Sequence, residues 1–340
     1  MAGSDWWRRY SFILWMAVAV AFAAAFPDVG APGGLLKTDL WNWALVSALF
    51  LISGLLLPSE SLGAAISRWR LHLFVQGVSL VFIPALFWLA AKLLGSAGMH
   101  PSLVLGLLFL GALSTTTTTA VVMVRSCGGD EAAAVFNAVL GSLLGVIVSP
   151  WIILITTGRS GSLPLLPVMS KLAIQVILPL LIGQAVRIRA AGAISRFRIQ
   201  FSRISLTFLL VLVWIVMCAG FQRGFNASVA QITLVMISVI FLHGVALGAA
   251  FQLSGWRGFG LNRANRTAAM ICSTQKSAVL GLPLLLLVFG GENSLGLIVL
   301  PLLIYHPLQL IAASLLIPRL ALWNQETEPE KGDLSGGEAV

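Results

Sequence analysis

Ten long apolar stretches dominate this chain of 340 residues and leave it few ways to fold. Hydrophobic residues make up 58% of the sequence and charged residues only 10%, too little charge to cover a soluble domain of this size. About 20 apolar residues in an α-helix cross the hydrocarbon core of a bilayer. We therefore predict an all-α polytopic membrane protein whose ten transmembrane helices lie near 11–26, 40–57, 71–94, 101–125, 132–157, 165–188, 204–221, 229–253, 266–289 and 293–322.

The positive charge of the chain follows this topology. With the N-terminus in the cytoplasm, fifteen Lys and Arg residues fall on the cytoplasmic side and five on the other side. Cytoplasmic loops of membrane proteins carry such an excess. We expect a multi-pass protein of the cell membrane with both termini in the cytoplasm. The net charge of the chain is +9. We expect its cytoplasmic basic side chains to face anionic lipid, and we expect no nucleic-acid partner.

The longest basic loop, 187–203, separates five predicted helices from five more. Because five is odd, the second half must insert upside down relative to the first, which is the architecture of inverted-repeat secondary transporters. Residues 1–322 are expected to form one transmembrane domain. From Trp323 the composition becomes acidic and glycine-rich, and 323–340 is predicted to be a disordered cytoplasmic tail.

Polar side chains interrupt two predicted helices at corresponding places in the two halves, Ser114–Thr119 and Ser273–Ser277. Such breaks survive at membrane depth only where the backbone lines a cavity or packs in protein. Paired breaks point to a transporter's binding site. The freed N–H ends would favour an anion and the freed carbonyl ends a cation. In the alternative, the hydroxyls bond back to their own helix and no break exists.

Lys276 is the most costly residue at this depth, because a charge there costs about 2.5–3.5 kcal/mol and persists where it is used. A lysine that snorkels to the surface is the alternative, but Lys276 lies far from both ends of its predicted helix. Other polar residues in the predicted spans more often form interhelical hydrogen bonds than contact a ligand; they include Gln76, Ser79, Asn137, His306 and Gln309. No enzyme motif, cofactor motif or metal-binding cysteine spacing occurs, so no enzyme is expected.

Four segments carry a resemblance to a known family: Arg70–Gln76, Gly128–Asn137, Cys272–Ser277 and Pro301–Pro307. With them the chain resembles the bile acid:sodium symporter family (solute carrier family 10), within it the divergent branch of the seventh member, from about residue 5 to 320. The resemblance implies a panel domain of about 11–57 and 165–221 and a core domain of about 71–157 and 229–322. Helices 4 and 9 would be unwound and cross at mid-membrane. Family members hold two sodium ions behind this crossing and carry organic anions.

The resemblance also implies roles for single residues. Matches to the family's sodium-site and crossing motifs fall at Gln76 or Ser79, Thr118, Thr119, Gln275 and Ser277. We therefore expect ion-binding or ion-replacing roles at Gln76, Ser79, Thr118, Thr119, Asn137, Ser273, Thr274, Gln275 and Lys276. Substrate-binding roles are expected at Thr117, Ser277, His306 and Gln309.

The departures from the family pattern concern sodium. Ile271 stands near the position of a glutamate that serves both sodium sites, and Lys276 replaces an asparagine. Ala134 and Ala138 fall near liganding hydroxyls, with only Asn137 close by. Sodium beside an ammonium would be repelled strongly in a low-dielectric site. We hypothesise that Lys276 replaces a bound sodium and caps the carbonyl ends of the broken helices.

These observations predict a secondary active transporter of an organic anion that works by alternating access. Sodium remains a possible coupling ion, and loss of the Lys276 proton during the cycle would instead couple transport to protons. The span offers Lys276 no acidic partner, so the substrate anion is expected to supply its counter-charge. The alternative is a membrane regulator of cellular calcium that transports nothing itself.

Overall fold

The computed structural model describes residues 2–57, 68–116, 118–157, 170, 173–290 and 292–325, and within these ranges the chain is helical without a strand. Within the described residues, each predicted apolar stretch coincides with one helix or with consecutive helices. The elements are α1 (Ala2–Ala25), α2 (Pro27–Gly30), α3 (Thr38–Leu56), α5 (Trp69–Gly77), η2 (Val78–Phe82), α6 (Ile83–Ser96), α7 (Pro101–Ala112), α8 (Thr118–Ser126), α9 (Glu131–Thr157), η4 (Ala173–Ile177), α11 (Leu178–Arg196), α12 (Arg198–Arg223), α13 (Val229–Ser254), α14 (Arg263–Thr274), α15 (Ala278–Phe289) and α16 (Leu295–Gln325).

Seven helical segments of the described chain are long and apolar enough to cross a membrane. They are Trp69–Ser96, Glu131–Thr156, Ala173–Arg196, Arg198–Arg223, Val229–Ser254, Arg263–Phe289 and Leu295–Gln325. Three shorter apolar helices accompany them, Phe12–Ala25, Trp41–Leu56 and Pro101–Ala112. The predicted all-helical, polytopic class is confirmed, whereas the full count of ten crossings stays a prediction.

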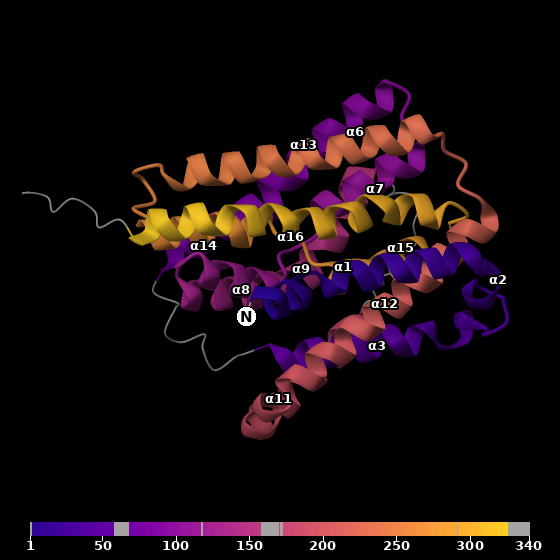
Figure 1. Cartoon of the computed structure of the whole chain (residues 1–340), viewed down its shortest axis with the longest axis horizontal. Helices are drawn as coiled ribbons and strands as arrows, with labels where there is room; N and C mark the ends of the chain where they lie inside the picture. The colour runs from indigo at the N-terminus through magenta and orange to yellow at the C-terminus, as the bar shows by residue number, and fades with distance from the viewer. Residues whose placement is uncertain are drawn as a thin grey trace, which may run out of the picture.

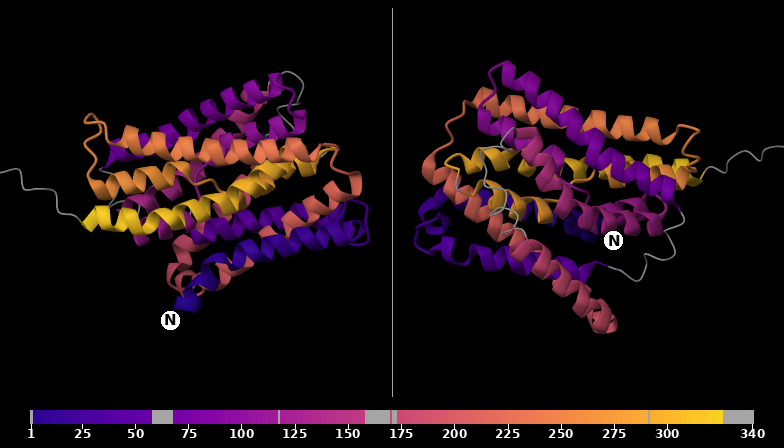
Figure 2. Two further views of the ribbon diagram at one scale, coloured as in Figure 1. Left: turned by 45° about the horizontal axis from the view of Figure 1, so that its top comes forward. Right: turned by 180° about the vertical axis from the view of Figure 1, so that it is seen from behind.

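The helices pack in two groups (Figure 1). In the first group, α3 packs against α11 and α12, and α1 and α2 pack against α12. In the second group, α7 packs against α6, α9 and α16, and α14 contacts α5, α8, α9 and α13. α12 joins the groups through its contacts with α15 and α16. The start of α1 and the end of α16 lie on the same side of the molecule in both further views (Figure 2).

Glycines allow several of these helices to approach closely. A Cβ atom added to Gly54 of α3 would lie 2.3 Å from the carbonyl oxygen of Leu180, and one added to Gly183 of α11 would lie 2.3 Å from that of Leu51. Between the two groups, a Cβ atom on Gly296 of α16 would lie 2.9 Å from the Cα atom of Gly220 in α12. Small residues serve this purpose at helix contacts in membranes, because packing rather than the hydrophobic effect joins the helices there.

The predicted basic loop 187–203 is wrong as a loop. α11 continues to Arg196 with a kink at Ala190, and α12 begins at Arg198. Alanine and arginine are strong helix formers, so a basic segment continues a helix as readily as it leaves one. Arg187 is buried, and its Nη1 donates to the carbonyl oxygen of Leu55 at 2.8 Å.

The predicted tail begins too early. Trp323–Gln325 belong to α16, and the Asn324 side chain donates to the carbonyl oxygen of Cys127 at 2.7 Å and to Oγ1 of Thr267 at 2.9 Å. These two bonds anchor the end of α16 to the start of the α8–α9 turn and to α14. The remaining part of the predicted tail, 326–340, lies outside the described residues.

Candidate functional site

Two polar breaks lie at the centre of the second group. α7 ends at Ala112, residues 113–116 are non-helical, and α8 begins at Thr118. α14 ends at Thr274, residues 275–277 are non-helical, and α15 begins at Ala278. The backbone N–H of Ser277 donates to the carbonyl oxygen of Ser114 at 3.1 Å. The breaks therefore contact one another, and the alternative of two uninterrupted helices is wrong.

Hydroxyl groups shape the break after α14. The Oγ atom of Ser273 donates to the carbonyl oxygen of Ala269 at 2.7 Å, and Oγ1 of Thr274 donates to that of Met270 at 2.8 Å. Ser277 caps α15, because its Oγ atom accepts a bond from the N–H of Leu280 at 3.2 Å. The hydroxyls of Ser273 and Thr274, expected at an ion site, are thus engaged with their own helix in this structure.

The Lys276 side chain ends among backbone carbonyl groups and is only 1% exposed. Its Nζ atom donates to the carbonyl oxygens of Ser79 at 3.0 Å, of Gly111 at 3.3 Å, and of Leu113. Gly111 and Leu113 lie at the carbonyl end of α7, where helix carbonyls lack an internal partner. An ammonium has three N–H groups, and these three acceptors account for all of them.

The carbonyl oxygen of Ser79 is free to accept a bond from Lys276 because Ser79 lies in the π-helix η2. The N–H of Ile83 donates to the carbonyl of Val78, one residue further back than in an α-helix. The next residue able to continue this pattern onto Ser79 is Pro84, which has no N–H. The carbonyl of Ser79 is therefore left without a donor from its own helix, and Lys276 supplies one.

Gln309 holds the peptide of Lys276 from the side of α16. The backbone N–H of Lys276 donates to Oε1 of Gln309 at 2.6 Å, and Nε2 of Gln309 donates to the carbonyl oxygen of Lys276 at 2.8 Å. The same Nε2 lies 3.1 Å from Nδ1 of His306. Nε2 of Gln275 donates to the carbonyl of Gln309 at 3.3 Å. Gln309 is 0% exposed and its side chain is engaged with the break, so its expected contact with a substrate stays a prediction.

Tyr305 closes the carbonyl end of α14. Its hydroxyl donates to the carbonyl oxygen of Thr274 at 2.6 Å, and Nδ1 of His243 lies 2.9 Å from the same hydroxyl. Tyr305 is not among the residues that the sequence predicts at the site. A buried tyrosine needs a partner for its hydroxyl, and this hydroxyl within an apolar span was the available signal.

A second set of polar residues surrounds Gly141 of α9. Nε2 of Gln76 lies 3.3 Å from both the backbone oxygen and Oδ1 of Asn137. A Cβ atom on Gly141 would lie 2.6 Å from Thr115 and 3.5 Å from Oε1 of Gln76. The side-chain oxygens of Gln76, Thr115 and Ser79 are buried without a hydrogen-bond partner in the described part of the chain. Buried acceptors of this kind fit a cation or an ordered water.

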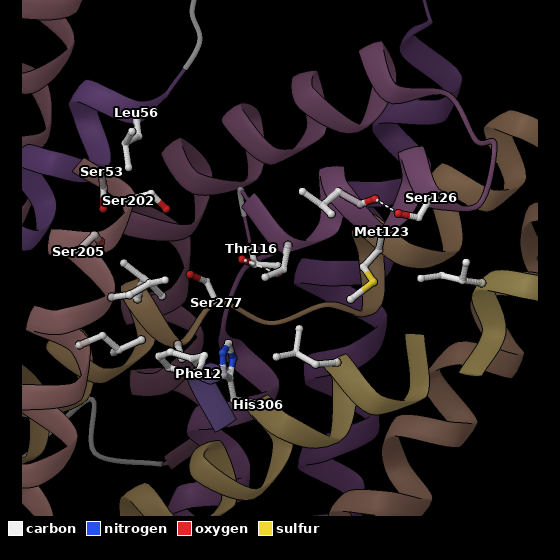
Figure 3. A pocket seen from close by; sticks show the side chains of 18 residues that line it. Phe12, Ser53, Leu56, Thr116, Met123, Ser126, Ser202, Ser205, Ser277 and His306 are labelled. Atoms are coloured by element: carbon white, nitrogen blue, oxygen red, sulfur yellow. Dashed lines mark hydrogen bonds between the residues drawn. The ribbon is translucent and has the colours of Figure 1, made fainter. Parts of the chain in front are cut away.

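A cavity of about 480 Å³ separates the two helix groups beside the breaks (Figure 3). The first group contributes residues such as Phe12, Ser53, Ser202 and Ser205, and the second contributes Thr116, Thr119, Ser277 and His306. No charged side chain is among the described residues that line it. Lys276 is not in the lining either, so its ammonium faces the carbonyl oxygens rather than the cavity.

The remaining expected residues are less well placed. Thr117 lies outside the described residues, and α8 begins at Thr118, of whose side chain nothing is described. Oγ1 of Thr119 donates to Oγ1 of Thr116 at 3.1 Å at the edge of the cavity. Of the four residues expected to bind substrate, Ser277 and His306 line the cavity.

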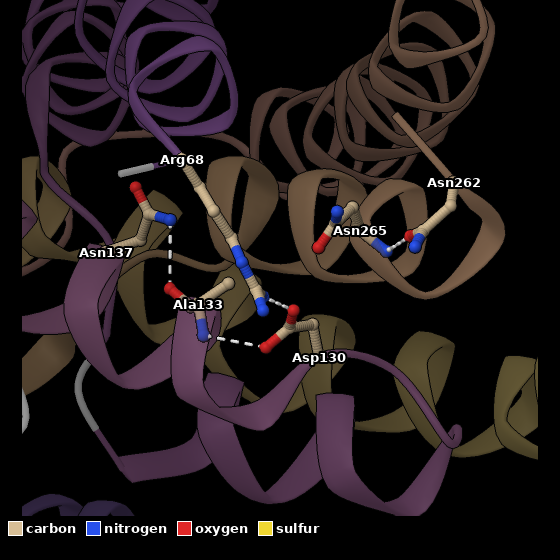
Figure 4. Close-up of polar contacts among 6 residues, drawn as sticks. All are labelled: Arg68, Asp130, Ala133, Asn137, Asn262 and Asn265. Carbon is tan, nitrogen blue, oxygen red and sulfur yellow. Dashed lines mark hydrogen bonds and ion pairs between the residues drawn. The ribbon is translucent and has the colours of Figure 1, made fainter. Parts of the chain in front are cut away.

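An ion pair fixes the start of α9 near one end of the second group (Figure 4). Arg68 pairs with Asp130, whose Oδ1 also accepts a bond from the N–H of Ala133 at 3.0 Å. The N–H of Asp130 donates to the carbonyl of Ala264 in α14 at 3.2 Å. Asp130 is therefore a structural residue that joins α9 to α14 rather than a ligand at the breaks.

Broken helices that meet beside a cavity, in an all-helical chain with membrane-length apolar segments, define a transporter-like membrane protein. Comparison with known proteins gives the family. The sequence profile of the SBF-like CPA transporter family matches residues 10–322. The chain belongs to this family, which confirms the resemblance found in the sequence motifs.

Named relatives cover nearly the whole chain. Sodium/bile acid cotransporter 7 of Mus musculus is 36% identical over 322 residues, which span 93% of this chain and 94% of that protein. The protein of the same name from Danio rerio is 35% identical over 319 residues, 93% and 95% of the two chains. An uncharacterized protein of Pseudomonas aeruginosa is 28% identical over 315 residues, 92% of each. The family and the names of the mouse and zebrafish relatives agree with a transporter rather than an enzyme or a regulator that transports nothing.

Proposed function

We propose that this chain is a secondary active transporter that moves an organic anion across the cell membrane by alternating access. The observation that carries the proposal is the junction of the two breaks, which lies beside a cavity and holds a buried ammonium among carbonyl oxygens. The N–H ends of α8 and α15 would favour an anion, and the carbonyl end of α7 would favour a cation.

The cavity side suits an anion with an apolar body. α8 and α15 both begin at the cavity, where Thr119 and Ser277 contribute hydroxyl groups. Helix N-termini attract anionic groups, and hydroxyls donate hydrogen bonds to them. Apolar side chains such as Leu206 and Leu209 complete the wall. The names of the relatives make bile acids the first class to test.

On the carbonyl side, Lys276 would take the place of a bound sodium. Its three contacts with carbonyl oxygens are those that a cation would make at the end of α7. A second cation beside this ammonium would be repelled. The unpartnered oxygens of Gln76, Thr115 and Ser79 are the candidate ligands for any sodium that does bind.

Movement between the two helix groups would give alternating access. We take the first group, with α1, α3, α11 and α12, as the panel and the second group as the core. The ten crossings would form two inverted repeats whose interrupted helices cross at the breaks. Contact between Gly220 and Gly296 would close one side while the cavity opens on the other.

Uptake of cholate into proteoliposomes tests the proposal. Accumulation is expected above that in protein-free vesicles when a sodium or a proton gradient is imposed. Ser202→Trp fills the cavity from α12 and should lower uptake at least tenfold. Ser238→Trp, in α13 and outside the cavity lining, is the matched control and should leave uptake near the wild-type rate. Equal uptake by both variants, or none by the wild-type protein for any of a set of organic anions, would refute the proposal.

A further inference from the structure

The orientation of the Gln309 side-chain amide is fixed by the backbone. A peptide N–H can only donate and a peptide C=O can only accept. Because both groups of Lys276 face Gln309, its Oε1 must lie toward the N–H and its Nε2 toward the C=O, at 2.6 and 2.8 Å. Exchanging Oε1 and Nε2 would break both hydrogen bonds at once, so the hydrogen-bond network alone assigns the oxygen and nitrogen of this amide.

This orientation determines where His306 carries its proton. Nε2 of Gln309 has two N–H groups and no lone pair for accepting, and its second N–H points to Nδ1 of His306 at 3.1 Å. Nδ1 must therefore be unprotonated, which leaves the proton of the neutral ring on Nε2. The ring of Phe12 lies edge-on to the imidazole with centroids 5.3 Å apart and helps to hold it in place.

The protonated nitrogen of His306, Nε2, is available to a molecule in the cavity. His306 lines the cavity, is 6% exposed, and its Nε2 makes no hydrogen bond within the described part of the chain. We propose that Gln309 is a positioning residue, which holds His306 in the Nε2–H tautomer so that the cavity presents a neutral donor to its occupant. The site then selects solutes whose acceptor, such as a carboxylate, reaches this N–H. That the occupant is transported rests on the proposed function; the tautomer does not.

The same amide joins the cavity to the break. The Gln309 side chain is hydrogen-bonded to His306 and to the backbone N–H and C=O of Lys276. A solute that moves the His306 ring would therefore also move Gln309, which positions Lys276. Gln309 acts through the two residues that it orients.

His243 provides an internal reference. The single proton of the Tyr305 hydroxyl is donated to the carbonyl of Thr274, so Nδ1 of His243 must be the donor in its bond to that hydroxyl. His306 and His243 are thus expected to carry their protons on opposite ring nitrogens. The chain has four histidines, which keeps their spectra separable.

Solid-state NMR of the ¹⁵N,¹³C-histidine-labelled protein in lipid vesicles at neutral pH tests the proposal, with signals assigned from His306→Gln and His243→Gln. We expect an unprotonated Nδ1 for His306 and a protonated Nδ1 for His243. In Gln309→Glu, the carboxylate can only accept, so Nδ1 of His306 should move to the protonated position while His243 stays unchanged. Gln76→Glu makes the same chemical change away from both rings and should move neither signal.

A protonated Nδ1 on His306 in the wild-type protein would overturn the proposal without any variant. So would a Gln309→Glu spectrum with the wild-type tautomer. Cholate, added at a concentration that supports uptake, should shift the Nε2 signal of His306 and leave its Nδ1 unprotonated; a shift confined to other residues would contradict the donor role. Predicted tautomers combined with failed uptake of every anion would refute the transport proposal alone.

Discussion

At the scale of single residues, the site is built by satisfying backbone groups that two helix breaks set free. Buried peptide groups need partners, and no water is available in the bilayer core. Lys276 donates to carbonyl oxygens at the end of α7 and in the π-helix η2. Tyr305 donates to the carbonyl oxygen of Thr274, and Gln309 donates to that of Lys276. Each of these side chains is buried to 1% exposure or less.

Tyr305→Phe tests this use of side chains. The variant leaves the carbonyl of Thr274 and Nδ1 of His243 without their partner, and an unsatisfied buried group costs about 1–3 kcal/mol. The thermal unfolding midpoint of the purified protein should therefore fall. Ser238→Ala removes a hydroxyl that bonds only its own helix at an exposed site, and should change stability by less than about 0.5 kcal/mol. Equal midpoints for the two variants would show that Tyr305 is dispensable.

The sequence revealed the polar side chains of the site better than their partners. Lys276, His306 and Gln309 stood out because polar groups are costly at membrane depth. The carbonyl oxygens of Gly111 and Leu113 could not be found this way, because every residue has one. Ser273 and Thr274 were chosen for their hydroxyls, and the sequence does not tell whether a hydroxyl bonds its own helix or a ligand.

At the scale of helices, glycine contacts determine how closely the elements approach. Gly54 and Gly183 bring α3 and α11 together within one group, whereas Gly220 and Gly296 bring α12 and α16 together between the groups. Only the second contact must open if the groups move. Loss of the α3–α11 contact should destabilise the fold. Loss of the α12–α16 contact should destabilise only the conformation in which the two groups touch at Gly220 and Gly296.

Gly296→Ala tests the contact between the groups. The added methyl would lie 2.9 Å from the Cα atom of Gly220 and from the Phe225 ring, so α12 and α16 must separate. We expect cholate uptake to slow several-fold because closure on this side is hindered. Gly244→Ala in α13 is the control, since no atom lies within 4 Å of its added Cβ. Alanine in a helix is favoured over glycine by about 0.5–1 kcal/mol, so that variant should be as stable as wild type or more. Unchanged uptake in Gly296→Ala would contradict this role.

The sequence predicts the positions of the long helices better than the residues at which helices begin and end. Apolar runs located the helices of membrane length, because the length of a membrane span is set by the bilayer. The charge of 187–203 predicts a loop, although its residues favour helix. The π-helix η2 was missed, since no apolar pattern marks it; Pro84 was the available sign.

At the scale of the whole molecule, we propose that a tethered ammonium takes the position of a cation inside the second helix group, among carbonyl oxygens at the end of α7 and in η2. The family relation makes a transporter the expected function. Ile271 stands near the position where the resemblance predicts a sodium-site glutamate, and Lys276 is expected to take over the role of the ion. The cavity lies beside the breaks and Lys276 is absent from its lining, so a solute and a cation would act on the same junction at different places.

The thermal midpoint of Lys276→Ala in sodium chloride against choline chloride tests this claim most directly. We expect a wild-type midpoint that sodium does not change, and a lower midpoint in Lys276→Ala that sodium raises because the ion enters the vacated place among the carbonyl oxygens. At 100 times its dissociation constant, sodium would stabilise the variant by about 2.7 kcal/mol. Lys92→Ala, which removes a lysine beside Trp88, should behave as wild type in both salts. A Lys276→Ala midpoint that is lowered equally in both salts, or not lowered at all, would contradict the account.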